Sequence, residues 1–160
     1  IQVFNHSSFG KEPIADLNIK SSVLNPCEVT PGDVPNLIDE LPILFIASCF
    51  AEGTSSFIDV EELKHKESDR LKAMQDGLDK MKIKNSLNGN VFCIEGLGKD
   101  YKSPYFLAET DYDHRIAMSF AIAGLNSDSS IEIASPECIN TSFPEFIELG
   151  KKLGCNFEIS

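Results

Sequence analysis

The chain has 160 residues, of which 42% are hydrophobic, enough to bury a core as one domain. Its net charge of −11 and pI near 4.6 disfavour binding to nucleic acid or to anionic membranes, because both partners require a basic surface. The five cysteines are odd in number and contain no C-x-x-C pair. We therefore expect neither a disulfide framework nor a zinc site, no other metal or cofactor, and a reducing, cytoplasmic compartment.

The sequence shows no signal peptide and no membrane-spanning segment. The longest apolar run, Leu41 to Ala51, is interrupted by Pro42 and Ser48 and is too short to cross a bilayer. The chain opens at Ile1, without an initiator methionine, in what reads as a strand. We therefore expect it to be a piece of a longer protein.

The elements predicted in chain order alternate between strands and helices. A turn-rich connector containing three prolines is expected over 25–36, and Asn88-Gly89 is typical of a hairpin turn. Strands are predicted at 1–4, 16–20, 54–59, 83–87, 91–95, 130–134 and 155–159, and helices at 40–51, 68–82, 114–126 and 143–153. This order predicts an α/β or α+β fold with mixed sheets.

Four of the helices begin beside charged or capping side chains. The clearest case is Asp113-His114-Arg115, which precedes a segment that is apolar on nearly every side and so must be covered all round. Asp39-Glu40 precedes the apolar run 41–51, the basic segment 64–70 leads into a helix, and Ser142 can cap the last helix, with Pro144 in its first turn. Helix amino termini favour anions, so this repetition indicates an anion-binding site.

These same segments carry a resemblance to a known family. The motifs at 38–42 (Ile-Asp-Glu-Leu-Pro), 61–70, 113–120 (Asp-His-Arg-Ile-Ala-Met-Ser-Phe) and 141–146 (Thr-Ser-Phe-Pro-Glu-Phe) look like successive C-terminal motifs of the 3-phosphoshikimate 1-carboxyvinyltransferases, also called EPSP synthases. The resemblance implies an inside-out α/β barrel built from repeated βαβαββ units, with buried helices and outer sheets. Residues 1–160 would be most of the C-terminal domain of a two-domain enzyme, whose N-terminal domain is absent from this chain.

The resemblance also implies a reaction and the residues that carry it. The enolpyruvyl group of phosphoenolpyruvate would be transferred to the 5-hydroxyl of shikimate 3-phosphate, which requires proton transfer and cations for two anionic substrates. Asp39 and Glu67 match the family's catalytic carboxylates, and Asp39 also contacts the attacking hydroxyl. Arg70 and Arg115 match the pair that grips the phosphoenolpyruvate carboxylate, while Lys66 and His114 match further substrate-binding positions.

The residues also allow plainer interpretations. Asp39 can be only a helix cap, and Glu67 with Arg70 can be a solvated ion pair that contributes little. Two rival functions are a UDP-N-acetylglucosamine carboxyvinyltransferase-like enzyme, against which the 113–118 motif argues, and a non-catalytic anion-binding or interaction domain. One position departs from the family pattern: Thr141 stands where many members carry a lysine, and a hydroxyl supplies neither a full charge nor a titratable amine.

Overall fold

A computed structural model, which describes residues 1–158, shows a mixed α/β fold with three separate sheets. The first half of the main body forms one complete βαβαββ unit, whose first crossover connection also contains the short helix α1 (Val34–Leu37). The unit consists of β3 (Glu28–Val29), α2 (Leu41–Cys49), β4 (Glu52–Ile58), α3 (Arg70–Lys80), β5 (Lys84–Asn88) and β6 (Val91–Leu97), with a 3-10 helix, η1 (Val60–His65), ahead of α3. Its sheet has the order β3-β4-β6-β5, with β3 and β4 parallel and the remaining pairs antiparallel.

The second half begins the same pattern again. It consists of β7 (Phe106–Ala108), α4 (His114–Gly124), β8 (Ile131–Ile133), a second 3-10 helix, η2 (Pro136–Thr141), and α5 (Phe146–Lys152). Strands β7 and β8 pair in parallel, as β3 and β4 do. This half therefore repeats the βαβα part of the unit.

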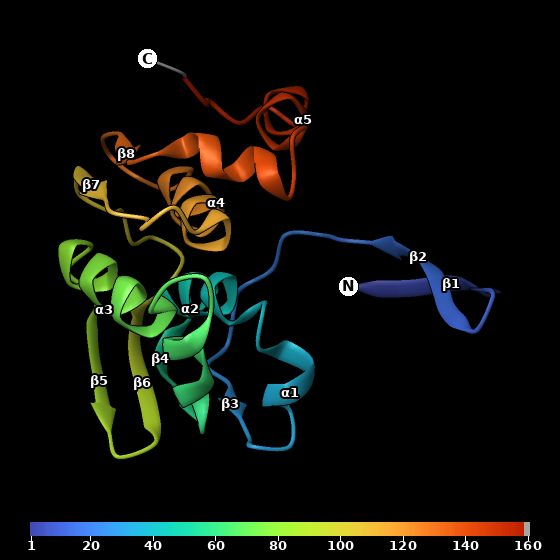
Figure 1. The fold of residues 1–160 in the computed structure, drawn as a ribbon, viewed down its shortest axis with the longest axis horizontal. Coiled ribbons are helices and arrows are strands. Elements are labelled where there is room, and N and C mark those ends of the chain that lie inside the picture. The colour runs from blue at the N-terminus through green and yellow to red at the C-terminus, as the bar shows by residue number, and fades with distance from the viewer. Residues whose placement is uncertain (159–160) are drawn as a thin grey trace.

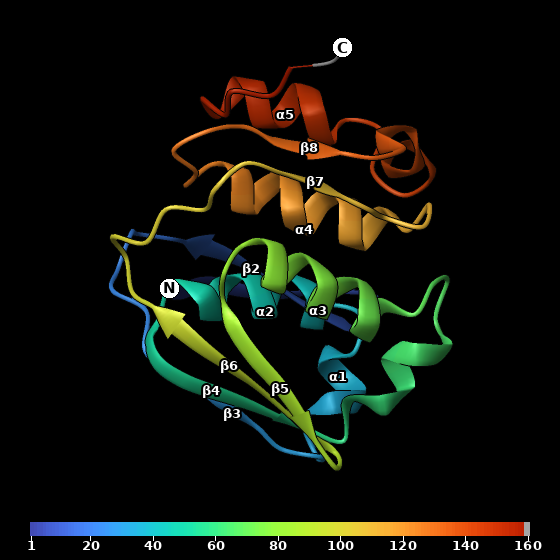
Figure 2. The same ribbon diagram turned by 90° about the vertical axis from the view of Figure 1, so that its left-hand side faces the viewer.

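Helices α2, α3 and α4 lie between the two sheets of the main body, whereas α5 lies above β8, outside them (Figure 2). Every residue of α2 is buried or half-buried, because the helix packs on β6 on one side and on α4 on the other. The predicted apolar face of α3, formed by Leu71, Met74 and Leu78, lies in the same core. Burial also raises the pKa of the Cys49 thiol to about 12, consistent with a purely packing role. Inner helices with outer sheets agree with the inside-out arrangement, although the sheets do not close into a barrel within residues 1–158.

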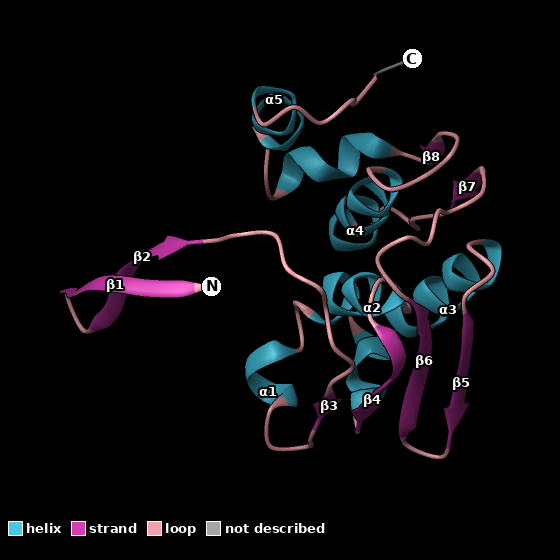
Figure 3. Ribbon diagram, turned by 180° about the vertical axis from the view of Figure 1, so that it is seen from behind, coloured by secondary structure: helices cyan, strands magenta, loops and turns pink. Residues whose placement is uncertain are grey.

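The amino-terminal hairpin lies apart from this body (Figures 1 and 3). It is formed by β1 (Gln2–Phe9) and β2 (Glu12–Asn18), which pair only with each other, and every residue in both strands is exposed. The exposed residues include the large apolar side chains of Phe4, Phe9, Ile14 and Leu17. Within the described residues, this apolar surface lacks a covering partner.

The structure corrects several predicted boundaries. The connector 25–36 contains β3 and the start of α1, strand β7 was not predicted, and residues 155–158 have no regular secondary structure, while 159 lies outside the described residues. Ser142 does not cap the last helix. The turn η2 continues through backbone hydrogen bonds from Ser142 and Phe143 to the Ile139 carbonyl, so α5 begins only after Glu145, and Pro144 precedes it.

A glycine sets how closely α3 approaches α4. A Cβ atom at Gly77 would lie 1.9 Å from Cζ of Phe120, whose ring is fully buried and packed edge-on against Phe106. We expect Gly77→Ala to lower the free energy of unfolding by about 1–3 kcal/mol through overpacking, although alanine favours helices by about 1 kcal/mol.

Urea unfolding followed by circular dichroism measures this effect. Gly124→Ala is the matched control, because a Cβ at that helical glycine would meet Ile131 at an ordinary 3.5 Å. Equal unfolding midpoints for the two variants would contradict the close α3–α4 contact.

Candidate functional site

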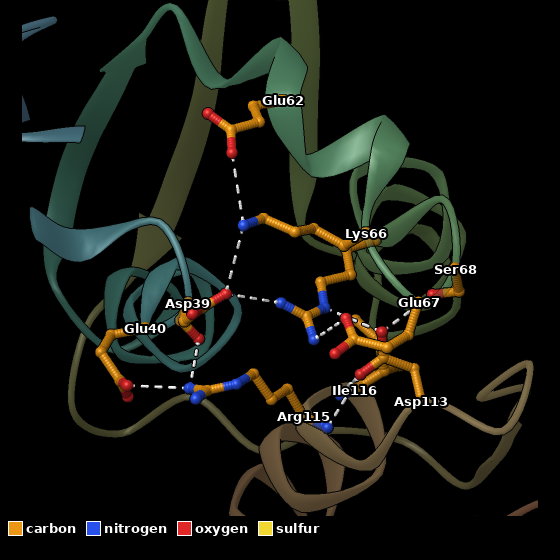
Figure 4. A network of polar contacts seen from close by, with 10 residues as sticks. Asp39, Glu40, Glu62, Lys66, Glu67, Ser68, Asp113, Arg115 and Ile116 are labelled. Carbon is orange, nitrogen blue, oxygen red and sulfur yellow. Dashed lines mark hydrogen bonds and ion pairs between the residues drawn. The ribbon is translucent and has the colours of Figure 1, made fainter. Parts of the chain in front are cut away.

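The amino termini of α2, α3 and α4 meet at one place, where charged side chains from four segments form a network (Figure 4). Asp39 and Glu40 come from the turn before α2, and Lys66, Glu67 and Ser68 from the link between η1 and α3. Arg70 is the first residue of α3, and Asp113 and Arg115 lie at the start of α4. The structure thus brings together Asp39, Lys66, Glu67, Arg70 and Arg115, which were predicted as site residues from the sequence.

Arg70 is the centre of this network. Its side chain is fully buried, and each guanidinium nitrogen donates to a different carboxylate: Nε to Asp113 Oδ2 at 2.8 Å, Nη1 to Asp39 Oδ1 at 3.0 Å and Nη2 to Glu67 Oε2 at 2.5 Å. Burial works to lower the pKa of Arg70, but these hydrogen bonds and charges outweigh it and raise the pKa above its ordinary value. Arg70 therefore stays charged, and the interpretation of Glu67 and Arg70 as a solvated pair is wrong for the arginine.

The two predicted catalytic carboxylates differ from Arg70 in exposure. The side chains of Asp39 and Glu67 are 49% and 57% exposed. Asp39 Oδ1 also lies 3.5 Å from Lys66 Nζ. Desolvation raises the pKa of Asp39, but Lys66, Arg115 and Arg70 together lower it below its ordinary value, so this carboxylate is ionised at neutral pH.

Asp39 is not the helix cap that the plainer interpretation assumed. The residue at the cap position of α2 is Glu40, and its side chain makes no capping hydrogen bond. Each of the carboxylates Asp39 and Glu67 keeps one oxygen that has no hydrogen-bond partner among residues 1–158. These oxygens are available to a ligand or to a reacting proton.

Arg115 and Lys66 are the remaining cations of the network. Arg115 Nη1 donates to the Asp39 carbonyl at 2.7 Å and to Glu40 Oε1 at 2.8 Å, while Lys66 also pairs with Glu62 Oε1 at 3.4 Å. Three cations therefore face five carboxylates, those of Asp39, Glu40, Glu62, Glu67 and Asp113. The network is net negative, so these residues by themselves are a poor site for a multiply charged anion.

Two residues of the predicted site motifs stand outside the network. His114, the first residue of α4, is half-buried, and its side chain has no hydrogen-bond or ion-pair partner among the described residues. Thr141, the departure from the family pattern, donates its hydroxyl to the Cys138 carbonyl at 2.7 Å and so closes the turn η2. In this structure the Thr141 hydroxyl therefore stabilises a local turn.

Asp113, Ser68 and Glu40 belong to the predicted motifs but were not predicted as catalytic or substrate-binding residues. Asp113 caps α4, as an aspartate directly before a helix commonly does, but it also binds Arg70 across 43 positions of sequence. The sequence signal for this role was its position directly before His114-Arg115, at the amino terminus of an apolar helix. Ser68 and Glu40 carried no comparable signal, because their contacts depend on how α2 and α4 pack.

None of the helices within residues 1–158 combines the length and hydropathy needed to cross a membrane.

The family model described as EPSP synthase (3-phosphoshikimate 1-carboxyvinyltransferase) matches residues 8–149. A 3-phosphoshikimate 1-carboxyvinyltransferase from Zymomonas mobilis is 43% identical over 99% of this chain and 36% of its own length, and one from Petrotoga mobilis is 41% identical over 96% and 35%.

Solved structures give the same picture. An EPSP synthase structure from Acinetobacter baumannii matches with a TM-score of 0.93 at 42% identity, covering 99% of this chain and 37% of that chain. The enolpyruvyl transferase NikO from Streptomyces tendae matches with a TM-score of 0.65 at 16% identity, which shows similarity of fold alone. The chain spans about a third of the length of these relatives.

Proposed function

The chain belongs to the EPSP synthase family, and from that premise we propose that residues 1–160 form most of the C-terminal domain of a two-domain synthase. The whole enzyme would transfer the enolpyruvyl group of phosphoenolpyruvate to the 5-hydroxyl of shikimate 3-phosphate. The product is 5-enolpyruvylshikimate 3-phosphate, and phosphate is released. A cytoplasmic location and a requirement for the missing N-terminal domain are parts of this proposal.

The observation that carries the proposal is the convergence of Asp39, Glu67, Arg70 and Arg115 from four segments onto one network. A base takes the hydroxyl proton as the hydroxyl oxygen bonds to C2 of phosphoenolpyruvate, and an acid protonates C3. The tetrahedral intermediate then loses phosphate from C2 and a proton from C3. Two carboxylates with a free oxygen each, Asp39 and Glu67, supply the acid and base that these steps require.

The arginines supply the contacts that a carboxylate substrate needs. Arg115 is within reach of the Asp39 backbone, and its pairing with Glu40 is partly exposed, so an incoming anion can replace that partner. Asp39 and Glu67 each bind one N–H of the Arg70 Nη atoms, and the guanidinium is fully buried, so a ligand reaches it only when one of these carboxylates moves. In the proposed enzyme, Lys66 and His114 contact the substrates from the edge of the same site.

Two features favour a second polypeptide region beside this one. The net-negative network needs additional cations before it can hold two phosphorylated anions, and these would come from the N-terminal domain. The apolar side chains of the β1–β2 hairpin are also exposed here, as expected if they pack on a part of the enzyme outside this chain.

A phosphate-release assay tests the proposal. The two-domain enzyme is expected to release phosphate when given phosphoenolpyruvate and shikimate 3-phosphate, and to be inactive when UDP-N-acetylglucosamine replaces the latter. The purified 160-residue chain is expected to show no turnover and only weak binding of phosphoenolpyruvate by calorimetry, because the network alone is net negative.

Each alternative has its own outcome in this experiment. Turnover with UDP-N-acetylglucosamine would assign the enzyme to the sister reaction. A two-domain protein that binds both anions without turnover would be a binding module. Full activity of the 160-residue chain alone would contradict the two-domain interpretation.

A further inference from the structure

Asp113 links the start of α4 to Arg70. Its side chain is fully buried, and both carboxylate oxygens are used: Oδ1 accepts the backbone N–H groups of Arg115 at 2.9 Å and Ile116 at 3.4 Å. Oδ2 accepts Arg70 Nε at 2.8 Å and the Ser68 hydroxyl at 3.1 Å. One carboxylate therefore caps the helix that carries His114 and Arg115 and also binds the arginine at the centre of the network.

The guanidinium of Arg70 has two different edges. Its Nε edge faces Asp113, which is 0% exposed, whereas its Nη nitrogens face Asp39 and Glu67, whose side chains are about half exposed. Because a guanidinium group is planar and rigid, fixing the Nε bond also fixes the directions in which the Nη nitrogens donate. Moving Asp113 would turn the Nη nitrogens away from the exposed carboxylates.

We infer that Asp113 is the positioning residue for Arg70, holding Nε so that Nη1 and Nη2 face the site where a substrate carboxylate binds. Asp39 and Glu67 occupy those Nη donors here and can be displaced toward solvent, whereas Asp113, enclosed by the protein, stays in place. Asp113 also holds Arg70 in a fixed position relative to Arg115, since the same carboxylate caps α4, the helix that carries Arg115. The inference rests on the proposed function, in which Arg70 and Arg115 grip phosphoenolpyruvate.

Asp113→Asn in the two-domain enzyme tests this role. Asparagine caps helices as well as aspartate does, so its oxygen can keep the bonds to the α4 backbone. The amide NH2 group then takes the place of Oδ2. Because it is a donor, it cannot accept the hydrogen bonds from Arg70 Nε and the Ser68 hydroxyl. We expect the KM for phosphoenolpyruvate to rise roughly ten- to hundredfold through loss of a charged hydrogen bond, with the KM for shikimate 3-phosphate nearly unchanged.

Asp69→Asn is the matched control. Asp69 caps α3 by accepting the Lys72 N–H at 3.0 Å, lies one residue before Arg70 and is exposed, but its side chain makes no hydrogen bond or ion pair with that of Arg70. Its substitution should leave both KM values at wild-type level. Equal rises in both KM values for Asp113→Asn, or none, would overturn the positioning role.

A double-mutant cycle separates positioning from general stability. Arg70→Lys removes Nε, so adding Asp113→Asn in that background should have little further effect on the KM for phosphoenolpyruvate. A purely structural role predicts additive losses instead. If Asp113→Asn fails to fold, Ser68→Ala removes only the hydroxyl bond to Oδ2, and the expected result is a several-fold rise confined to phosphoenolpyruvate. An unchanged KM would then refute the role.

A ligand-free measurement distinguishes failure of this inference from failure of the proposed function. Absence of turnover by the wild-type enzyme would contradict the proposed function but not the contact between Asp113 and Arg70. Nitrogen-15 NMR of the arginine Nε–H groups then decides the Asp113 contact: the Arg70 signal, identified by its loss in Arg70→Lys, should exchange slowly in the wild type and in Asp69→Asn. Asp113→Asn should abolish that protection, and its persistence would overturn the inference.

Discussion

Glu67→Gln in the two-domain enzyme is expected to lower turnover by about 10²–10⁴-fold while both substrates still bind, because the amide keeps the size of the side chain but cannot carry a proton. The structure gives the reason for choosing this residue. Arg70 Nη2 holds one oxygen of Glu67 at 2.5 Å, and the other oxygen, on a side chain that is 57% exposed, is free among the described residues. Single-turnover rates and substrate dissociation constants measure the two effects separately.

Glu61→Gln is the matched control for this substitution. Glu61 lies in the same segment, is similarly exposed and, among the described residues, pairs only with Lys64, at 3.3 Å. Its variant should match the wild type, whereas Asp39→Asn should be about as damaging as Glu67→Gln. Turnover of Glu67→Gln within a few-fold of the wild type would reduce Glu67 to a partner of Arg70 and move the proton transfer to another group.

Arg70→Met is expected to destabilise the fold by about 3–5 kcal/mol, because it leaves the buried Asp113 carboxylate without its cation. Methionine is apolar and fills the space of the aliphatic part of the arginine, so the loss reports the uncompensated charge more than a cavity. Urea unfolding of the 160-residue chain measures it. The double variant with Asp113→Asn should recover part of the loss, since it removes that charge as well.

Arg115→Met is the comparison for Arg70→Met. The Arg115 side chain is partly exposed and pairs with the exposed Glu40, so its removal should cost about 1 kcal/mol or less. Equal losses for the two variants would show that burial of Arg70 does not set its contribution to stability.

The elements with local sequence signals could be predicted from the sequence alone. The apolar run at 41–51 predicted a helix covered on all sides, as α2 is, and Asn88-Gly89 predicted the β5–β6 hairpin. The caps of α3 and α4 by Asp69 and Asp113 are also local, because each side chain accepts N–H groups two or three residues further along, although the Asp69 cap was not predicted. Ser142 shows the limit of such signals, because backbone hydrogen bonds that extend η2 take the place of its cap.

Motifs in the sequence also predicted five residues of the network, Asp39, Lys66, Glu67, Arg70 and Arg115, but how these residues pair follows from the tertiary fold. The spacing of Glu67 and Arg70 permits an ion pair, yet whether that pair is solvated depends on α2 and α4, which carry Asp39 and Asp113 to the same guanidinium and enclose it. The short parallel pairing of β7 with β8 also depends on segments distant in sequence. Local patterns specify which groups are present, whereas burial and the choice of partner follow from long-range packing, which no short segment encodes.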